Sequence, residues 1–279
     1  MAYDRCTSSF LLVFMVSLAK CSGFTRTGIV SLAALAAVKT FAMSLSTTAS
    51  SNTPSTNKAA LIFLHGLGDT PAGWSSLETH LPSLRPRLSE ITYVFPPSPT
   101  IPLTINDGAK MPGWFDLYDW PIKVGSRDDL AGLKSAVEII EKCVQKLEKE
   151  GIKRDKIVIG GFSQGGAVAL LAAYNASIQK IDGYAGCAIL SGWLTLPEQL
   201  GEISSEAIGT PLYWGHGERD DKVTFGQQRF GVNTLKKAGL NDMKISEFDM
   251  GHSSHPEEIE QYAEFLEKVL FANDVTQEK

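Results

Sequence analysis

The sequence has 279 residues, of which 43% are hydrophobic and 20% are charged, and its formal net charge is −5. This length is enough for one large α/β domain with a sizeable core. The mildly acidic charge and the lack of a basic cluster argue against a nucleic-acid-binding protein. The cysteines are far apart and show no C-x-x-C spacing, so neither a zinc site nor a disulfide framework is expected. They are Cys6, Cys21, Cys143 and Cys187.

Residues 1–57 differ in composition from the rest of the chain. After Asp4 no acidic residue occurs until Asp69, and Ser, Thr and Ala dominate. Residues 10–19 form an apolar run of the length found in signal peptides, too short to span a bilayer. Residues 44–57 are rich in Ser and Thr and read as a disordered linker. These features predict a targeting-like segment at 1–57, followed by a folded domain at 58–279.

Three interpretations of this N-terminal segment stay open. It is a cleaved presequence for the secretory system or for an organelle such as a plastid, or it is an uncleaved membrane anchor. Alternatively, translation begins at Met43 and the product is cytoplasmic. We slightly favour the presequence over the Met43 start. N-terminal sequencing of the mature protein distinguishes these possibilities.

The remaining chain alternates apolar runs with amphipathic segments. Strands are expected at residues 59–64, 91–95, 157–159, 187–190, 211–214 and 243–248. Helices are expected at residues 128–150, after 163 as far as 174, at 225–238 and at 256–271. Ser126 and Asp129 are the expected N-cap pair of the 128–150 helix, and Gly151 is its expected stop. Strands that alternate with helices predict an α/β fold with a mostly parallel, doubly wound sheet flanked by helices.

A long segment at residues 96–127 separates the second predicted strand from the first long helix. It carries four aromatic residues, Trp114, Phe115, Tyr118 and Trp120. Long loops of this kind usually form covers or walls of binding sites. For any single ring, packing against the core is an equally good interpretation.

The motif Gly161-Phe-Ser163-Gln-Gly165 lies between a β-branched run and an Ala/Leu-rich helix, which is the setting that G-x-S-x-G requires. A serine on a sharp strand-to-helix turn is strained, so its neighbours must lack bulk, and the glycines supply this. The turn places the Ser163 hydroxyl at a helix N-terminus, where negative charge is favoured. Ser163 is therefore a candidate nucleophile, and a glycine-rich turn with a solvated serine is the alternative.

A serine hydroxyl needs a base to take its proton, and the base needs a carboxylate to orient it. In this architecture these groups follow in the order Ser, Asp or Glu, His, each at the carboxyl end of a strand. For the base, His252 is favoured over His255, because it lies closer to the strand end and follows a glycine. Candidates for the acid are Glu218, Asp220, Asp221 and Asp249, of which Asp220 leads and Asp221 is the main rival.

Attack on a carbonyl group creates an oxyanion, which needs preorganised N–H donors worth about 3 kcal/mol each. One expected donor is the N–H of Gln164, directly after the nucleophile. The other is expected in the turn after the 59–64 strand, at Leu67. His65 and His216 lie in glycine turns at strand ends and are expected to be structural.

Six motifs together resemble the acyl-protein thioesterases, in the phospholipase/carboxylesterase group of α/β-hydrolases. They are His65-Gly-Leu-Gly-Asp-Thr70, Pro112-Gly-Trp-Phe-Asp116, Gly160-Gly-Phe-Ser-Gln-Gly-Gly-Ala167, Leu190-Ser-Gly-Trp-Leu194, His216-Gly-Glu-Arg-Asp220 and Met250-Gly-His-Ser-Ser254. The likeness runs from about residue 59 to the C-terminus, in order and with matching spacing. It implies an α/β-hydrolase fold and a serine hydrolase without metal or cofactor. The implied activity is removal of palmitoyl groups from S-acylated cysteines, with cleavage of lysophospholipids and small esters as side activities.

The resemblance also implies roles for individual residues. It implies Ser163 as nucleophile, Asp220 as acid, His252 as base, and Leu67 and Gln164 as oxyanion donors. It places the loop around Trp114 beside an acyl-binding channel. The family commonly has proline directly after the acid and again after the following valine, where this chain has Asp221 and Thr224.

The expected partners are S-acylated proteins or acyl-ester lipids as substrates, with transient contact to a membrane surface. The oligomeric state stays open. Two other functions compete with the thioesterase: a carboxylesterase that prefers short esters or lysophospholipids, and a hydrolase-fold binding protein without catalysis. The presence of Ser163, Asp220 and His252 argues against the binding protein.

Overall fold

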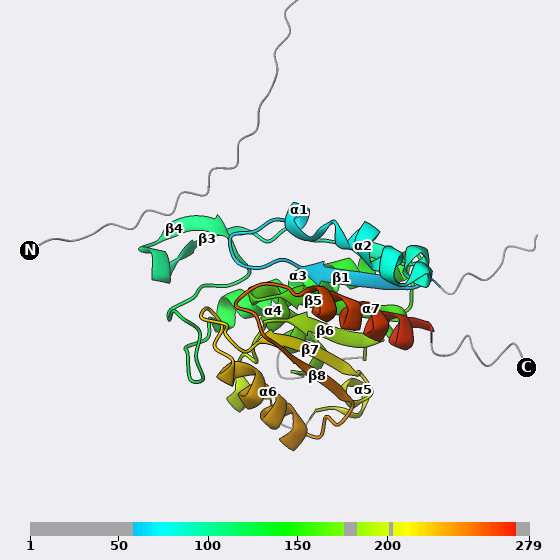
Figure 1. The fold of residues 1–279 in the computed structure, drawn as a ribbon. Coiled ribbons are helices and arrows are strands. Elements are labelled where there is room, and N and C mark those ends of the chain that lie inside the picture. The colour runs from blue at the N-terminus through cyan, green and yellow to red at the C-terminus, as the bar shows by residue number, and fades with distance from the viewer. Residues whose placement is uncertain (1–57, 176–182, 201–202, 272–279) are drawn as a thin grey trace, which may run out of the picture. The chain divides into compact units, whose positions relative to one another are not determined.

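The computed structural model describes residues 58–175, 183–200 and 203–271, and Figure 1 shows their arrangement. The targeting-like segment at 1–57 lies outside the described residues, so its interpretations stay open. Within the part that the structure describes, no helix is long and apolar enough to cross a membrane.

The core is a six-stranded sheet in which every neighbouring pair of strands is parallel. Its strands are β1 (Ala60–Leu64), β2 (Thr92–Val94), β5 (Ile157–Phe162), β6 (Gly186–Leu190), β7 (Leu212–Gly217) and β8 (Met243–Phe248). The spatial order is β2-β1-β5-β6-β7-β8. Parallel strands that are covered on both faces are apolar along their whole length, which is why β1 reads as a continuous run.

Helices cover both faces of the sheet (Figure 1). Those on one face are α3 (Leu130–Lys149), α4 (Gln164–Tyr174), α5 (Ser205–Ile208) and α6 (Gly226–Lys237). Those on the other are α2 (Leu77–Leu84) and α7 (Pro256–Phe271). Side chains of β1 alternate between the two cores, with Ile62 on the α3 side and Phe63 on the α7 side. The predicted doubly wound α/β architecture is confirmed.

The segment expected as a long loop at 96–127 contains secondary structure. Strands β3 (Thr100–Leu103) and β4 (Ala109–Pro112) form a separate antiparallel hairpin. The short helix α1 (Pro71–Trp74) and helix α2 were also not predicted. Strand β3 alternates exposed and more buried residues, but over only four residues, and β4 does not alternate, so periodicity gave little signal there.

Strand β5 runs three residues past its predicted end at residue 159, through Gly160 and Gly161. The G-x-S-x-G motif predicted Gly161 in the turn. In the structure, a Cβ on Gly160 would overlap the carbonyl oxygen of Ala188 in the neighbouring strand. The glycines therefore reflect close backbone approach inside the sheet as well as the turn that follows.

Helix α3 begins two residues after its predicted start, and its cap differs from the expectation. The Asp129 side chain accepts a hydrogen bond from the N–H of Gly132 at 3.1 Å, as an N-cap does. Ser126 instead accepts from the N–H of Lys123 at 2.9 Å. Leu130, the first residue of the helix, is exposed, whereas Leu133 one turn later is buried.

Glu258 is a fully buried carboxyl group on α7. Its Oε2 lies 3.4 Å from the N–H of His255, and its Oε1 has no hydrogen-bond partner among the described residues. Burial raises the pKa of Glu258 to about 8, and the hydrogen bond from the His255 N–H opposes this only weakly. The side chain is therefore protonated in the folded protein at neutral pH.

We expect Glu258→Gln to remove a pH dependence of stability. The unfolded carboxyl titrates at about 4.3, so between that pH and 8 the folded state holds the extra proton. Stability therefore falls as pH rises through this window, by up to about 1.4 kcal/mol per unit. Thermal unfolding at pH 5 and pH 8 should show a larger decrease in Tm for the wild type than for the variant. Exposed Glu257→Gln is the control, and equal pH dependence in all three proteins would contradict the assignment.

Candidate active site

Ser163 lies between β5 and α4 in strained backbone geometry, with φ 54° and ψ −120°. A positive φ is unfavourable for a residue with a Cβ and persists only where the surroundings enforce it. A Cβ on Gly161 or on Gly165 would overlap the backbone around Leu64 of β1, so both flanking positions require glycine. The motif therefore forms the strand–turn–helix that its spacing predicts.

The sheet register brings the other two candidate side chains to the carboxyl ends of the strands, where Ser163 also lies. Phe248, at the end of β8, lies opposite Gly217, at the end of β7. His252 follows β8 and Asp220 follows β7, so both are placed beyond the carboxyl ends of neighbouring strands. Parallel strands gather their following loops at one edge, which is where this fold class binds ligands.

Ser163, His252 and Asp220 form one hydrogen-bonded line. The Nε2 atom of His252 is 2.9 Å from Ser163 Oγ, and its Nδ1 atom is 2.7 Å from Asp220 Oδ2. An ionised carboxylate only accepts hydrogen bonds, so Nδ1 carries the proton and donates it. Nε2 is then free to accept the serine O–H, which is the arrangement that activates a hydroxyl.

Further donors hold the Asp220 carboxylate in place. Its Oδ1 accepts from the N–H groups of Lys222 and Val223, both at 2.9 Å. His216 Nε2 donates to the carbonyl of Val223 at 2.9 Å and lies 3.4 Å from Asp220 Oδ2. Burial raises the pKa of Asp220, but hydrogen bonds from His216 and His252 outweigh this and keep the pKa well below its usual range. The carboxylate is therefore ionised and can stabilise a positive charge on His252.

The rival candidates lie outside this line. Glu218, Asp221 and Asp249 are exposed, and the last two pair with Lys222 and Arg219. His255 stacks on Phe248, and its Nδ1 accepts from the N–H of Glu257 at 3.2 Å. The structure thus brings together the leading candidates and separates their alternatives from Ser163.

His65 has the structural surroundings that its glycine turn predicts. Its Nδ1 lies 2.8 Å from the carbonyl of Gly66, and its Nε2 accepts from the N–H of Ser98 at 3.3 Å. Both ring nitrogens are therefore occupied by main chain. His216, bonded to Val223, is equally buried.

Leu67 and Gln164, the residues expected to supply the oxyanion donors, line the same cavity as Ser163. Gln164 is the first residue of α4, where backbone N–H groups have no acceptor within the helix. Leu67 lies in the turn after β1, and β1 is paired with β5 up to Leu64 opposite Gly161. Both residues therefore lie beside the serine, as the chain order suggests.

The side chain of Gln164 has a separate structural task. It accepts from the N–H of Trp114 at 2.8 Å and donates to the carbonyl of Phe115 at 2.7 Å. The side chain is completely buried, so these bonds are shielded from water. They fix the 114–115 segment against the start of α4.

A cavity of about 520 Å³ opens above the Ser163 hydroxyl. Its apolar lining consists of Leu67, Trp74, Leu117, Trp120, Phe162 and Trp193. This volume falls within the range of about 300–1,000 Å³ that is typical of small-molecule sites. A largely apolar wall beside the hydrogen-bonded Ser163 and His252 suits a substrate with a long hydrocarbon portion.

The resemblance implies that the loop around Trp114 lies beside an acyl channel, and this loop does line the cavity, but the side chain of Trp114 itself does not. Its side chain is only 2% exposed, its Nε1 donates to the carbonyl of His65 at 2.8 Å, and it is not among the residues that line the cavity. Leu117, Trp120 and Trp193 provide that wall instead. Trp193 was missed as a site residue, although its position just after the end of β6 is a signal that could have revealed it.

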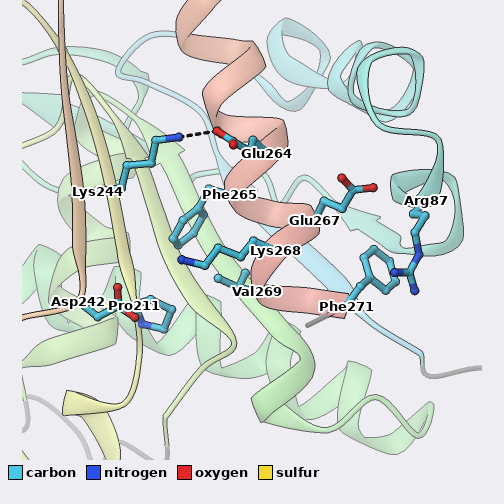
Figure 2. A pocket seen from close by; sticks show the side chains of 10 residues that line it. All are labelled: Arg87, Pro211, Asp242, Lys244, Glu264, Phe265, Glu267, Lys268, Val269 and Phe271. Carbon is cyan, nitrogen blue, oxygen red and sulfur yellow. Dashed lines mark hydrogen bonds and ion pairs between the residues drawn. The ribbon is translucent and has the colours of Figure 1, made fainter. Parts of the chain in front are cut away.

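A second cavity, of about 600 Å³, lies at the opposite edge of the sheet (Figure 2). Pro211 and Asp242, which directly precede β7 and β8, form one side of it. Phe265 and Phe271 of α7 form another side, and an ion pair joins Lys244 to Glu264 at 2.6 Å. Ser163 lies at the carboxyl ends of the strands, so this cavity is separate from the candidate site. Among the described residues, no group of three or more His, Cys, Asp or Glu side chains could hold a metal ion.

Residues 45–270 match the phospholipase/carboxylesterase family. The chain belongs to this family. Acyl-protein thioesterase 1 of Mycosarcoma maydis is 39% identical over 227 residues, which cover 76% of this chain and 91% of that protein. Acyl-protein thioesterase 1 of Saccharomyces cerevisiae is 36% identical over 221 residues, covering 76% and 93%.

Solved structures of similar proteins share the fold. Arabidopsis thaliana SOBER1 superposes with a TM-score of 0.68 at 30% identity, covering 76% of this chain and 99% of that chain. Zea mays acyl-protein thioesterase 2 gives a TM-score of 0.67 at 27% identity, covering 76% and 94%. The α/β-hydrolase fold is therefore confirmed, and the protein is a hydrolase of the thioesterase and esterase class.

Proposed function

We propose that this protein is a serine hydrolase that removes long acyl chains, palmitoyl in particular, from S-acylated cysteines of proteins. The observation that carries the proposal is the bonded line from Ser163 through His252 to Asp220, beside an apolar cavity. The substrate class is supported by relatives that are named acyl-protein thioesterases.

In the first half-reaction, Ser163 Oγ attacks the thioester carbonyl carbon while His252 Nε2 takes the hydroxyl proton. The carbonyl oxygen becomes an oxyanion that faces the N–H groups of Leu67 and Gln164. The C–S bond then breaks, and His252 returns the proton to the departing sulfur. The products are a free cysteine thiol and an acyl ester on Ser163. Asp220 stabilises the protonated imidazole without itself taking a proton.

In the second half-reaction, His252 removes a proton from water, and the resulting hydroxide attacks the acyl ester. The oxyanion faces the same donors, the C–O bond to Ser163 breaks, and the serine recovers its proton from His252. A free fatty acid leaves and the resting state is restored. The same steps cleave oxygen esters, so lysophospholipids and small esters are expected side substrates.

We expect palmitoyl thioesters to be hydrolysed with a higher kcat/KM than acetyl thioesters of the same cysteine peptide. Each methylene buried against the apolar wall contributes about 0.8 kcal/mol, so burial of even four methylenes gives a preference of roughly 200-fold. Steady-state rates over a series of acyl lengths measure this directly. A preference for the acetyl substrate would instead favour the short-chain carboxylesterase.

A further inference from the structure

Large hydrophobic side chains are exposed at few places on the described part of the molecule. They are Trp120 at 49%, Val124 at 50%, Leu130 at 38% and Ile208 at 41%. Three of these four lie within residues 120–130, whereas Ile208 lies on α5, just before the amino end of β7. Isolated exposed hydrophobic residues are ordinary, but a cluster of them on one loop marks an interaction surface.

This exposed cluster lies at the mouth of the candidate active site. Trp120 lines the cavity that contains Ser163, and it also lines a neighbouring hollow together with Val124. The segment connects β4 to α3 and extends past the side of the sheet where the strands end (Figure 1). A substrate that reaches Ser163 from this side passes the exposed indole.

The middle of the segment is fastened to the turn that carries Asp220. The N–H of Ile122 donates to the carbonyl of Lys222 at 2.8 Å, and the N–H of Thr224 donates to the carbonyl of Ile122 at 3.0 Å. The Thr224 hydroxyl reaches the same carbonyl at 3.2 Å. Proline, common in the family at this position, has neither an N–H nor a hydroxyl group, so the two hydrogen bonds from Thr224 depend on this departure from the pattern. Ile122 is buried, and its anchoring keeps Trp120 and Val124 on the outside.

Charged side chains of both signs flank the apolar cluster. Lys123 and Arg127 are exposed within the segment, and so is Asp119 just before it, whereas Lys222 on the anchoring turn pairs with exposed Asp221. Arg127 lies over the ring of Tyr118, 3.5 Å from its centroid. Tryptophan is enriched where proteins meet the interface of a phospholipid bilayer, and aliphatic side chains beside it contribute buried apolar area there.

We propose that residues 120–130 form a membrane-contact surface, in which Trp120, Val124 and Leu130 enter the interfacial layer of a phospholipid bilayer. The cavity above Ser163 then opens toward the lipid, where the acyl chain of an S-acylated protein resides. The contact surface rests on the proposed function only for the identity of that substrate. The proposed partner of this surface is a phospholipid bilayer. Binding of a protein to residues 120–130 without lipid would be a different interaction.

Tryptophan fluorescence provides a direct test on the full chain. The five tryptophans are Trp74, Trp114, Trp120, Trp193 and Trp214, and none lies in residues 1–57. Phosphatidylcholine vesicles with brominated acyl chains should therefore quench emission from Trp120. Residues 1–57 contribute no tryptophan emission, so insertion of that segment alone would not be detected directly. We expect quenching of the wild type and its loss in Trp120→Phe, which keeps an aromatic ring. Absence of quenching in the wild type, or undiminished quenching in the variant, would overturn the membrane-contact surface.

A kinetic comparison tests the surface independently. Val124→Ser should lower the ratio of kcat/KM for a palmitoyl peptide in vesicles to that for a soluble short-chain thioester, by about fivefold. Ile208→Ser, which removes a similar exposed side chain from the opposite edge of the sheet, should leave the ratio unchanged. An equal ratio in all three proteins would overturn the contact surface while leaving the thioesterase function in place. Quenching without thioester hydrolysis would support the surface and contradict the proposed function.

Discussion

Replacing Ser163 by alanine should lower kcat for a palmitoyl thioester by about 10⁵-fold or more. Among the described residues, the Ser163 hydroxyl is the group that is hydrogen-bonded to His252 Nε2, at 2.9 Å, and so placed to accept the acyl chain. Without it no acyl-enzyme forms, and only direct attack by water remains. Steady-state hydrolysis of a palmitoyl peptide measures the loss. A fluorophosphonate probe should label the wild type at Ser163, as shown by mass spectrometry, and leave the variant unlabelled.

Ser191 offers a matched control for this experiment. It also follows a sheet strand and has a positive φ, at 48°, but its hydroxyl has no hydrogen-bond partner among the described residues. Ser191→Ala should therefore change kcat by no more than about twofold. Retention of the wild-type rate in Ser163→Ala would refute the nucleophile. Absence of probe labelling in the wild type would favour a binding protein that has lost catalysis.

The hydrogen-bonded line of Ser163, His252 and Asp220 could be predicted from the sequence because few rules govern how it assembles. Ser163, Asp220 and His252 each follow an apolar run that forms a strand, and parallel strands bring their carboxyl ends together. Strand order and register are global properties, but the position of each residue just beyond its own strand is visible locally. The same local information separated His252 from His255, because only the first directly follows a glycine after the strand end.

The walls of the cavity could not be read from the sequence in this way. Trp114 and Trp120 lie on one irregular segment, yet one is buried and the other is half exposed. Their difference comes from distant partners: Gln164 fixes the backbone around Trp114, and Thr224 anchors the segment next to Trp120. Neither contact produces a periodic pattern or a fixed spacing in the sequence, because each joins elements that are far apart along the chain. The sequence therefore identifies the aromatic segment, but it does not show which of its rings are buried and which line the cavity.

Asp220→Asn should lower kcat by about 10⁴-fold with little change in KM. The geometry explains why so small a change is severe. Oδ1 accepts two backbone N–H groups, from Lys222 and Val223, so the amide oxygen of asparagine must take that place. The amide NH₂ then faces His252 Nδ1, which has to become an acceptor. The imidazole proton moves to Nε2 and points at Ser163, so the ring can no longer act as a base.

The neighbouring carboxylate provides the comparison that isolates this effect. Asp221→Asn removes the same charge one residue along the chain, but the Asp221 side chain is 73% exposed and pairs with Lys222 on the surface. It should change kcat by no more than about twofold, as exposed ion pairs contribute little. Equal losses in the two variants would point to a general electrostatic effect, and a larger loss in Asp221→Asn would move the acid to that residue. A selective loss in Asp220→Asn would show that the carboxylate acts by fixing the proton on one nitrogen of His252.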